Sequence, residues 1–245
     1  MDLVQAGMTV SGKGRLFGIG IGPGDPDLLT LKGFQAICDA PVLAYPAPEH
    51  GDSLARQIVA PHLDGHHIEI CIRMPMVSAR FPAQEVYDWA AKEIAQHLDA
   101  GRDVACLCEG DPFVYGSFSF LFARLHDEYT VEVVPGVSSI TACAAVAGTP
   151  LSTRNDVLAV LPATLPDNEL AQRLVHVDAA AIIKVGRNLA KVRRVLADVQ
   201  LLQCATYVER ATLPNQRIVP LSCLDAPVAP YFSMVLVHRR GLAWA

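Results

Sequence analysis

Three apolar runs in the first half of the chain each end in a turn that contains glycine. These turns are Gly18–Pro26 (GIGIGPGDP), Glu109–Gly116 (EGDPFVYG) and Pro135–Thr141 (PGVSSIT). Each run predicts a β-strand, and each turn leads into a stretch that predicts a helix. Open α/β sheets bind ligands at such turns, beyond the carboxyl ends of their strands. A single glycine turn is also a common tight connection, but two that share Gly-Asp-Pro are much harder to attribute to chance.

The first turn predicts a site for a small organic molecule rather than for a phosphate group. Leu16 to Ile21 predicts a strand and 27–40 a helix, with Asp25 as its N-cap and Pro26 at its first position. Pro23 interrupts the dinucleotide-binding pattern, and no Lys-Ser or Lys-Thr pair follows the glycines as in a P-loop. Because glycine has no Cβ, we expect a ligand to approach the backbone closely here.

The order of the predicted elements indicates two α/β domains. Up to residue 147 strands alternate with helices, which predicts a mostly parallel sheet; the second half predicts a mixed sheet. The segment 148–156 is polar and lacks periodicity, so we place the boundary there: a flexible leader 1–14, an N-terminal domain 15–150 and a C-terminal domain 151–245. After the first strand and helix, the predicted strands are 41–45, 67–72, 104–108, 131–134, 157–161, 180–184, 204–208, 217–220 and 233–237, and the predicted helices are 53–59, 82–100, 116–125, 141–147, 167–175 and 189–198.

Composition excludes several classes of protein. Apolar residues make up 51% of the chain and charged residues 18%, so disorder is not expected. The net charge of −5 argues against a nucleic-acid surface, which needs clustered lysine and arginine. No apolar run approaches the roughly 20 residues that span a bilayer, and 1–14 lacks the features of a secretory signal. We therefore expect a cytoplasmic protein that binds neither membrane nor nucleic acid.

Cysteine and histidine usage predicts reduced thiols and no metal. The seven cysteines are an odd number and lie mostly in apolar segments, which favours buried free thiols. Cys106 and Cys108 are two apart on a predicted strand, so their side chains should share one face. His62, His66, His67 and Cys71 form a loose cluster with irregular spacing, which we interpret as a solvated loop rather than a metal site.

Together the three turns resemble the motifs of the S-adenosylmethionine-dependent tetrapyrrole methylases. The matching stretches are 20–30 (GIGPGDPDLLT), 109–116 (EGDPFVYG) and 134–138 (VPGVS), and the resemblance extends from Gly14 to Val237. Four further stretches resemble the branch of this family that methylates C20 of precorrin-2. They are 44–46 (AYP), 108–111 (CEGD), 207–214 (YVERATLP) and 230–234 (PYFSM).

The resemblance implies a two-domain fold, a homodimer, and a methyl donor held in a trough between the domains. It implies donor contacts at matching positions, which are Pro23, Glu109, Gly110, Asp111, Val114, Ser138, Ser139, Val185 and Ala211. It also suggests substrate contacts: Lys184 and Arg210 suit the carboxylates of a tetrapyrrole, and Arg154 either binds these carboxylates or is a surface residue. Tyr45 either packs against the ring system or completes the core. We expect Tyr115 to complete the core, and Asp111 to act either as a donor contact or as a turn cap.

Three departures from the pattern of the uroporphyrinogen methylases concern individual contacts. Glu109 stands where glycine is common, and Ser138-Ser139 replaces Thr-Ala. Tyr45-Pro46 stands where those enzymes carry an aspartate, which suggests a different presentation of the macrocycle.

The implied reaction is methyl transfer from S-adenosylmethionine to C20 of precorrin-2, giving precorrin-3A in cobalamin (corrin) biosynthesis. A sulfonium methyl group is already electrophilic, so positioning and desolvation can supply most of the catalysis without a metal or a catalytic triad. No catalytic residue can be assigned from the sequence. The cobalt-loaded substrate, cobalt-factor II, is the close alternative. The remaining alternatives are an RNA ribose methyltransferase, a diphthine synthase, another C-methyltransferase of the family, a non-enzymatic donor-binding module and a dehydrogenase.

Overall fold

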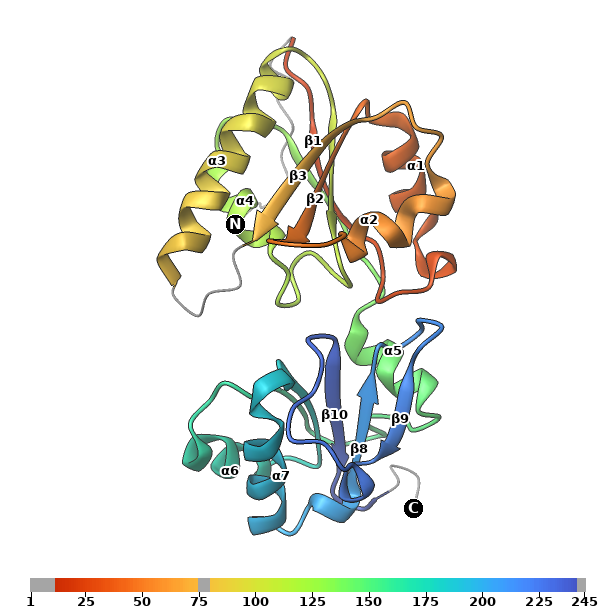
Figure 1. The fold of residues 1–245 in the computed structure, drawn as a ribbon, viewed down its shortest axis with the longest axis vertical. Helices are drawn as coiled ribbons and strands as arrows, with labels where there is room; N and C mark the ends of the chain where they lie inside the picture. The colour runs from red at the N-terminus through yellow and green to blue at the C-terminus, as the bar shows by residue number, and fades with distance from the viewer. Residues whose placement is uncertain (1–11, 75–79, 242–245) are drawn as a thin grey trace. The chain divides into compact units, whose positions relative to one another are not determined.

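The structure, a computed structural model, describes residues 12–74 and 80–241, and the side chains of 80–83 are not described. Residues 1–11 of the predicted leader therefore lie outside the described residues. The chain divides into two compact units, Met1–Ser138 and Ser139–Ala245 (Figure 1).

The first unit contains a five-stranded parallel sheet in the order β3-β2-β4-β1-β5. Its strands are β1 Leu16–Gly20, β2 Val42–Pro48, β3 Ile68–Met74, β4 Val104–Cys108 and β5 Val131–Val134. Its helices are α1 Leu31–Asp39, α2 Leu54–Val59, α3 Arg80–Asp99 and α4 Phe118–Leu125, with short 3₁₀ turns η1 Pro26–Leu28 and η2 Ala60–His62. The predicted parallel sheet is confirmed.

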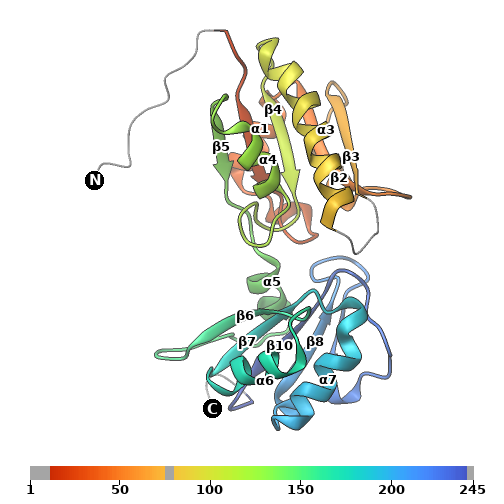
Figure 2. The same ribbon diagram turned by 90° about the vertical axis from the view of Figure 1, so that its left-hand side faces the viewer.

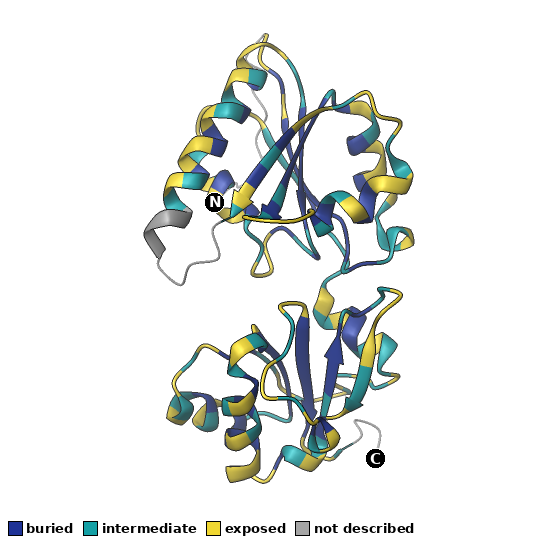
Figure 3. Ribbon diagram, viewed as in Figure 1, coloured by how far each residue is buried: buried dark blue, intermediate teal, exposed yellow. Residues whose placement is uncertain are grey.

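Helices cover both faces of this sheet, α1 and α2 on one side and α3 and α4 on the other (Figures 1 and 2). The strands alternate between the two resulting cores because successive side chains point to opposite faces. Cys106 and Cys108 pack toward α3 and α4, whereas Ala105 and Leu107 pack toward α1 and α2. Strands β1 and β4 in the middle of the sheet are buried along their whole length, whereas the edge strand β3 is partly exposed (Figure 3). The two cysteines thus share a face, as predicted.

The helix after the first turn begins later than predicted. Asp25 caps η1 by accepting a hydrogen bond from the Asp27 backbone N–H at 2.9 Å, and the chain then leaves helical geometry. Thr30 is the N-cap of α1, and its hydroxyl oxygen accepts from the Gly33 N–H at 3.1 Å. As a result Leu31 is 88% exposed instead of facing the core. The sequence contains both caps, and spacing alone did not separate them.

The second unit contains a mixed sheet in the order β6-β7-β10-β8-β9. Its strands are β6 Leu158–Pro162, β7 Ala179–Ile183, β8 Ala205–Glu209, β9 Arg217–Pro220 and β10 Ser233–His238. Its helices are α5 Ser139–Val146, α6 Asp167–Val175 and α7 Leu189–Asp198, with short 3₁₀ turns η3 Gly186–Asn188, η4 Leu202–Cys204 and η5 Leu221–Cys223. Strand β10 runs antiparallel to β7 and β8 on either side of it. The carboxyl ends of β7 and β8 therefore lie at the same edge of the sheet as the start of β10.

Helix α5 packs with the second unit, so the observed division lies earlier than the predicted boundary at 150/151. Its Cys143 is buried in one cluster with Ala181, Met234 and Leu236 of the second sheet. Helices α6 and α7 cover the opposite face. The predicted boundary followed the polar segment after α5, whereas the division follows the apolar contacts of the helix.

Candidate functional site

The three glycine turns meet at the carboxyl edge of the first sheet. Strand β1 lies between β4 and β5, so the turns that follow these strands are neighbours. The first two turns form an isolated antiparallel bridge: the Gly110 N–H donates to the Gly22 carbonyl at 2.8 Å, and the Gly22 N–H donates to the Gly110 carbonyl at 3.3 Å. Both glycines have positive φ, +81° at Gly22 and +68° at Gly110, which residues with a Cβ rarely adopt.

The glycines allow the turns to pack directly against one another. A Cβ on Gly136 would lie 2.1 Å from the Gly110 carbonyl oxygen, and one on Gly20 would lie 2.5 Å from the Gly136 nitrogen. On Gly18 it would strike the ring of Phe118 at 2.2 Å. We expected these positions to be open so that a ligand could approach the backbone. Instead protein atoms fill them, and the glycines hold three turns in backbone contact.

Asp111 connects the second turn to the third. Its Oδ1 accepts hydrogen bonds from the backbone N–H groups of Phe113 at 2.9 Å and Val114 at 3.1 Å. Its Oδ2 accepts from the Gly136 N–H at 3.1 Å. Both carboxylate oxygens are therefore engaged with the protein backbone. This geometry supports the turn-cap interpretation of Asp111 and gives it a positioning role.

Glu109 follows directly after β4 and is partly buried at the same edge. Burial raises the pKa of the Glu109 carboxyl group above its usual value. No cation pairs with it among the residues that the structure describes. A partly desolvated carboxylate without an ionic partner is electrostatically suited to a cationic ligand.

Apolar side chains of the second turn are exposed. Phe113, Val114 and Tyr115 are 52%, 44% and 54% exposed, and Tyr115 has a φ of +57°. The expectation that Tyr115 completes the core is therefore wrong, because more than half of this residue is exposed. Exposed apolar residues beside a ligand-binding edge offer a surface for an aromatic or aliphatic group.

The second unit presents cations at the edge where β7 and β8 end. Lys184 and Arg210 each follow one of these strands, and both have positive φ, +57° and +49°. The Arg210 N–H donates to the Phe232 carbonyl at 2.8 Å, and its guanidinium group pairs with Glu209. Non-glycine residues in the left-handed region store backbone strain, and strained residues cluster at active sites and ligand-binding sites.

A buried polar network supports Arg210. The Tyr207 hydroxyl donates to Glu209 Oε2 at 2.8 Å and lies 3.1 Å from the hydroxyl of Ser233. Glu209 is only 8% exposed. Its carboxylate is held from both sides, which fixes the guanidinium group that it binds. The sequence analysis missed this network; the alternation of Tyr207 and Glu209 on one strand was the available signal.

Tyr45 is a core residue. Its ring is 8% exposed, and its hydroxyl donates to Glu69 Oε2 at 2.6 Å. Burial is the larger cause and this hydrogen bond the next largest, and together they raise the pKa of Tyr45 to about 12. Arg56 in turn pairs with Glu69, and its contact lowers the pKa of that carboxyl group. The predicted role of Tyr45 against a macrocycle is not supported by this geometry.

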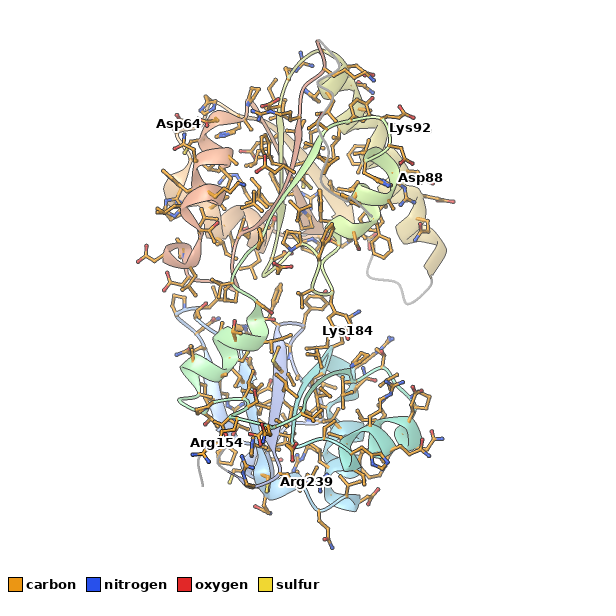
Figure 4. All side chains as sticks on the ribbon, turned by 180° about the vertical axis from the view of Figure 1, so that it is seen from behind. Asp64, Asp88, Lys92, Arg154, Lys184 and Arg239 are labelled. Atoms are coloured by element: carbon orange, nitrogen blue, oxygen red, sulfur yellow. The ribbon has the colours of Figure 1, made fainter. Side chains whose placement is uncertain are left out.

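Arg154 does not join Lys184 and Arg210. It lies before β6, at the amino edge of the second sheet, whereas the other two follow the carboxyl ends of β7 and β8. Figure 4 shows Arg154 and Lys184 at opposite ends of this unit. Its neighbour Asp156 accepts hydrogen bonds from the Thr153 N–H at 2.8 Å and from Arg240 at 2.9 Å. Arg154 is thus part of an exposed loop remote from the cationic edge.

The remaining predicted donor contacts differ in accessibility. Pro23 and Ser138 are partly buried in the first unit, and Ser139 is exposed at the start of α5. In the second unit, the Val185 side chain is fully buried and Ala211 is 7% exposed. A ligand at Val185 would therefore meet its backbone rather than its side chain.

The family described as Tetrapyrrole (Corrin/Porphyrin) Methylases matches residues 15–225. The chain belongs to this family.

Individual relatives of the chain carry more specific names. It is 42% identical to the precorrin-2 C(20)-methyltransferase of Sinorhizobium sp, over 94% of its own length and 97% of that protein. It is 34% identical to the cobalt-precorrin-2 C(20)-methyltransferase of Salmonella typhimurium, over 93% and 97%. It is also 42% identical to the cobalamin biosynthesis protein CobIJ of Mycobacterium bovis over 95% of its own length, but it spans only 48% of that relative.

Solved structures share the fold of this chain. A cobalt precorrin-4 methyltransferase matches with a TM-score of 0.71 and 24% identity, over 91% of this chain and 94% of that one. A uroporphyrin-III C-methyltransferase from Thermus thermophilus, solved with S-adenosylhomocysteine, matches with a TM-score of 0.68 and 24% identity, over 91% and 97%. The predicted pair of α/β domains, with a parallel and a mixed sheet, is confirmed.

Proposed function

We propose that this methylase transfers a methyl group from S-adenosylmethionine to C20 of precorrin-2, giving precorrin-3A in cobalamin biosynthesis. The observation that carries the proposal is the 42% identity to the Sinorhizobium precorrin-2 C(20)-methyltransferase, which extends over nearly the full length of both proteins. The stretches that suggested this branch include the strained segment around Arg210 and the Glu109 that replaces a glycine.

The first unit supplies features that fit the donor. S-adenosylmethionine brings an electrophilic methyl group on a positively charged sulfur. The carboxylate of Glu109 suits that positive charge, and the exposed side chains of Phe113 and Val114 suit an aromatic base. Gly110 and Asp111 hold the second turn in place, Pro23 lies on the first turn beside it, and Ser138 lies on the third turn. We propose that these residues bind the donor, with Ser139, Val185 and Ala211 as further contacts.

The second unit supplies features that fit a polycarboxylate substrate. Lys184 and Arg210 lie at one edge of the sheet, where Tyr231 and Phe232 stack edge to face at 4.9 Å. Tyr231 is 79% exposed. Cations beside exposed aromatic rings suit a large planar molecule that carries carboxylates. We propose that this edge binds the carboxylates of the macrocycle and orients its ring system.

The second candidate substrate is the cobalt-loaded form. The 34% identity to the Salmonella cobalt-precorrin-2 enzyme favours it less than the Sinorhizobium match favours the metal-free form. The two proposals are separated by measuring product formation with precorrin-2 and with its cobalt complex under the same conditions.

The deciding experiment is incubation with precorrin-2 and donor carrying a ¹³C-methyl group, followed by NMR of the product. Label at C20 is the expected result. Label at another ring carbon would refute the C20 assignment but not membership of the family. Donor binding without any methylated precorrin would instead support a non-enzymatic module.

We further propose that the enzyme is a cytoplasmic homodimer. All seven cysteines are free, which is consistent with a reducing compartment. None of the helices that the structure describes is long and apolar enough to cross a membrane. Leu31 and Phe34 of α1 are exposed and offer apolar surface for a subunit contact. Light scattering coupled to gel filtration, with Leu31→Glu as the interface variant, tests the dimer.

A further inference from the structure

A turn in the first unit brings two histidines and an aspartate together. Asp64, Gly65, His66 and His67 connect η2 to β3, and Gly65 has a φ of +87°. One ligand atom from each of Asp64, His66 and His67 lies within 4.8 Å of the other two. The His66 and His67 rings stack with their centroids 4.0 Å apart, and His66 Nδ1 contacts the Asp64 carboxylate. Asp64 is labelled in Figure 4.

His67 has one ring nitrogen that the protein leaves without a partner. Its Nε2 lies 2.8 Å from the Ile37 carbonyl oxygen. A carbonyl only accepts, so Nε2 carries the proton and the neutral ring has its lone pair on Nδ1. That Nδ1 is buried and has no hydrogen-bond partner among the described residues. Buried polar atoms without a partner are rare, and an ion or a water is the usual explanation.

The contact with Ile37 is also the arrangement that metal-binding histidines use. Such a histidine almost always donates its second ring N–H to a carbonyl or carboxylate, which fixes the ring and its tautomer. Two imidazole nitrogens and one carboxylate oxygen suit zinc and its neighbours, whereas magnesium and calcium prefer oxygen ligands alone. Because Asp64 and His66 are exposed, water can complete the coordination.

We propose that Asp64, His66 and His67 form a binding site for a divalent first-row transition metal such as Zn²⁺. This reverses our expectation of a simple solvated loop. Of the four residues in the expected cluster, His62 faces the Pro26 carbonyl and Cys71 lies within β3, so neither belongs to the set. The site precedes β3 and lies at the amino edge of the parallel sheet, opposite the glycine turns. It is therefore separate from the proposed donor site.

The test is calorimetric titration of the chelator-treated full-length chain with ZnCl₂ and, separately, with MgCl₂. The decisive variant is His67→Gln, whose amide N–H can still donate to Ile37 while the nitrogen lone pair is lost. His126→Ala is the matched control, because His126 is an exposed histidine that contacts a single aspartate, Asp127, at 3.3 Å. Unchanged urea midpoints in metal-free buffer show that both variants are folded.

The wild-type chain and His126→Ala are expected to bind one more equivalent of zinc than His67→Gln, and none is expected to bind magnesium. Loss of an outer-sphere partner alone weakens metal affinity by about 10- to 100-fold, so loss of a direct ligand should weaken it at least as much. Equal stoichiometry and affinity in His67→Gln would overturn the proposal. X-ray absorption that shows only sulfur ligands to the zinc would do the same, because it would assign the metal to the cysteines.

Discussion

Gly136→Ala tests whether close packing of the three turns positions the proposed donor site. Gly136 is not among the glycines with positive φ, so its backbone conformation is open to alanine. The cost therefore comes from the new Cβ, which would lie 2.1 Å from the Gly110 carbonyl oxygen and 2.6 Å from Gly20 Cα. Real Cβ contacts are essentially never shorter than 3.0 Å. The third turn must therefore move away from the other two.

The required movement sets the size of the effect. Relieving the contact takes a displacement of roughly 1 Å, and a misplacement of about 1 Å can reduce an enzymatic rate on the order of 100-fold. Inserting a methyl group into a packed region costs typically about 1–3 kcal/mol of unfolding free energy. The apolar clusters on both faces of the sheet are untouched, so we expect the variant to fold. Donor affinity should fall on the order of 100-fold, which corresponds to about 2.8 kcal/mol, while the variant remains folded.

The assay combines calorimetric binding of S-adenosylhomocysteine with urea denaturation. Gly148→Ala is the control: Gly148 has a φ of +62° and no atom near its Cβ position. That variant should lose about 1–2 kcal/mol of stability from backbone strain and keep its donor affinity. If Gly136→Ala binds S-adenosylhomocysteine within roughly tenfold of the wild type, the turns do not act as a rigid wall of the donor site.

Four further predictions concern charged side chains. Asp111→Asn removes charge from three backbone hydrogen bonds; we expect about 1–2 kcal/mol less stability and weaker donor binding, measured by urea denaturation and calorimetry. Glu109→Gln should weaken donor binding. The pKa of Glu109 is raised in the folded state, so the wild type loses stability as the pH rises above the unfolded pKa of about 4.3. The glutamine of the variant does not titrate, so in a pH series the urea midpoint of the variant should rise relative to that of the wild type. Arg210→Ala should reduce kcat/KM for precorrin-2 while donor affinity is unchanged, with Arg194→Ala on the surface of α7 as the control; equal kinetics in both would contradict a role in substrate binding. Hydrogen bonds, first that of the Thr153 N–H, lower the pKa of Asp156 to about 2, so the stability advantage over Asp156→Asn should be full above the unfolded pKa of about 3.9 and disappear as pH falls toward 2.

The order of elements could be predicted because it depends on local patterns. Helix α7 occupies the predicted residues, and the apolar stripe of α3 is buried at Ala90, Ile94 and Leu98 as its spacing requires. The start of helix α1 was misplaced because two capping residues lie five positions apart, and both are used: Asp25 caps η1 and Thr30 caps α1. Local propensity identifies the possible first residues of a helix, but the packing of the folded helix determines at which of them it begins.

The candidate site was predicted only in part. The sequence located the three turns, since glycine and proline act on their own backbone. It did not reveal that Gly136 and Gly110 touch, or that Asp111 bridges two turns separated by 25 positions. It also grouped Arg154 with Lys184, although the two lie at opposite edges of the second sheet.

The amino-acid sequence by itself determined the two α/β units, the alternation of buried strands and the family to which the chain belongs. These properties follow from hydrophobic periodicity and from motifs whose residues are adjacent in the chain. Only the tertiary structure decided which turns touch, that the Asp111 carboxylate accepts backbone hydrogen bonds, and that Nδ1 of His67 lacks a hydrogen-bond partner among the described residues. Such properties depend on strand order, because parallel neighbours in a sheet such as β1 and β4 are far apart in sequence.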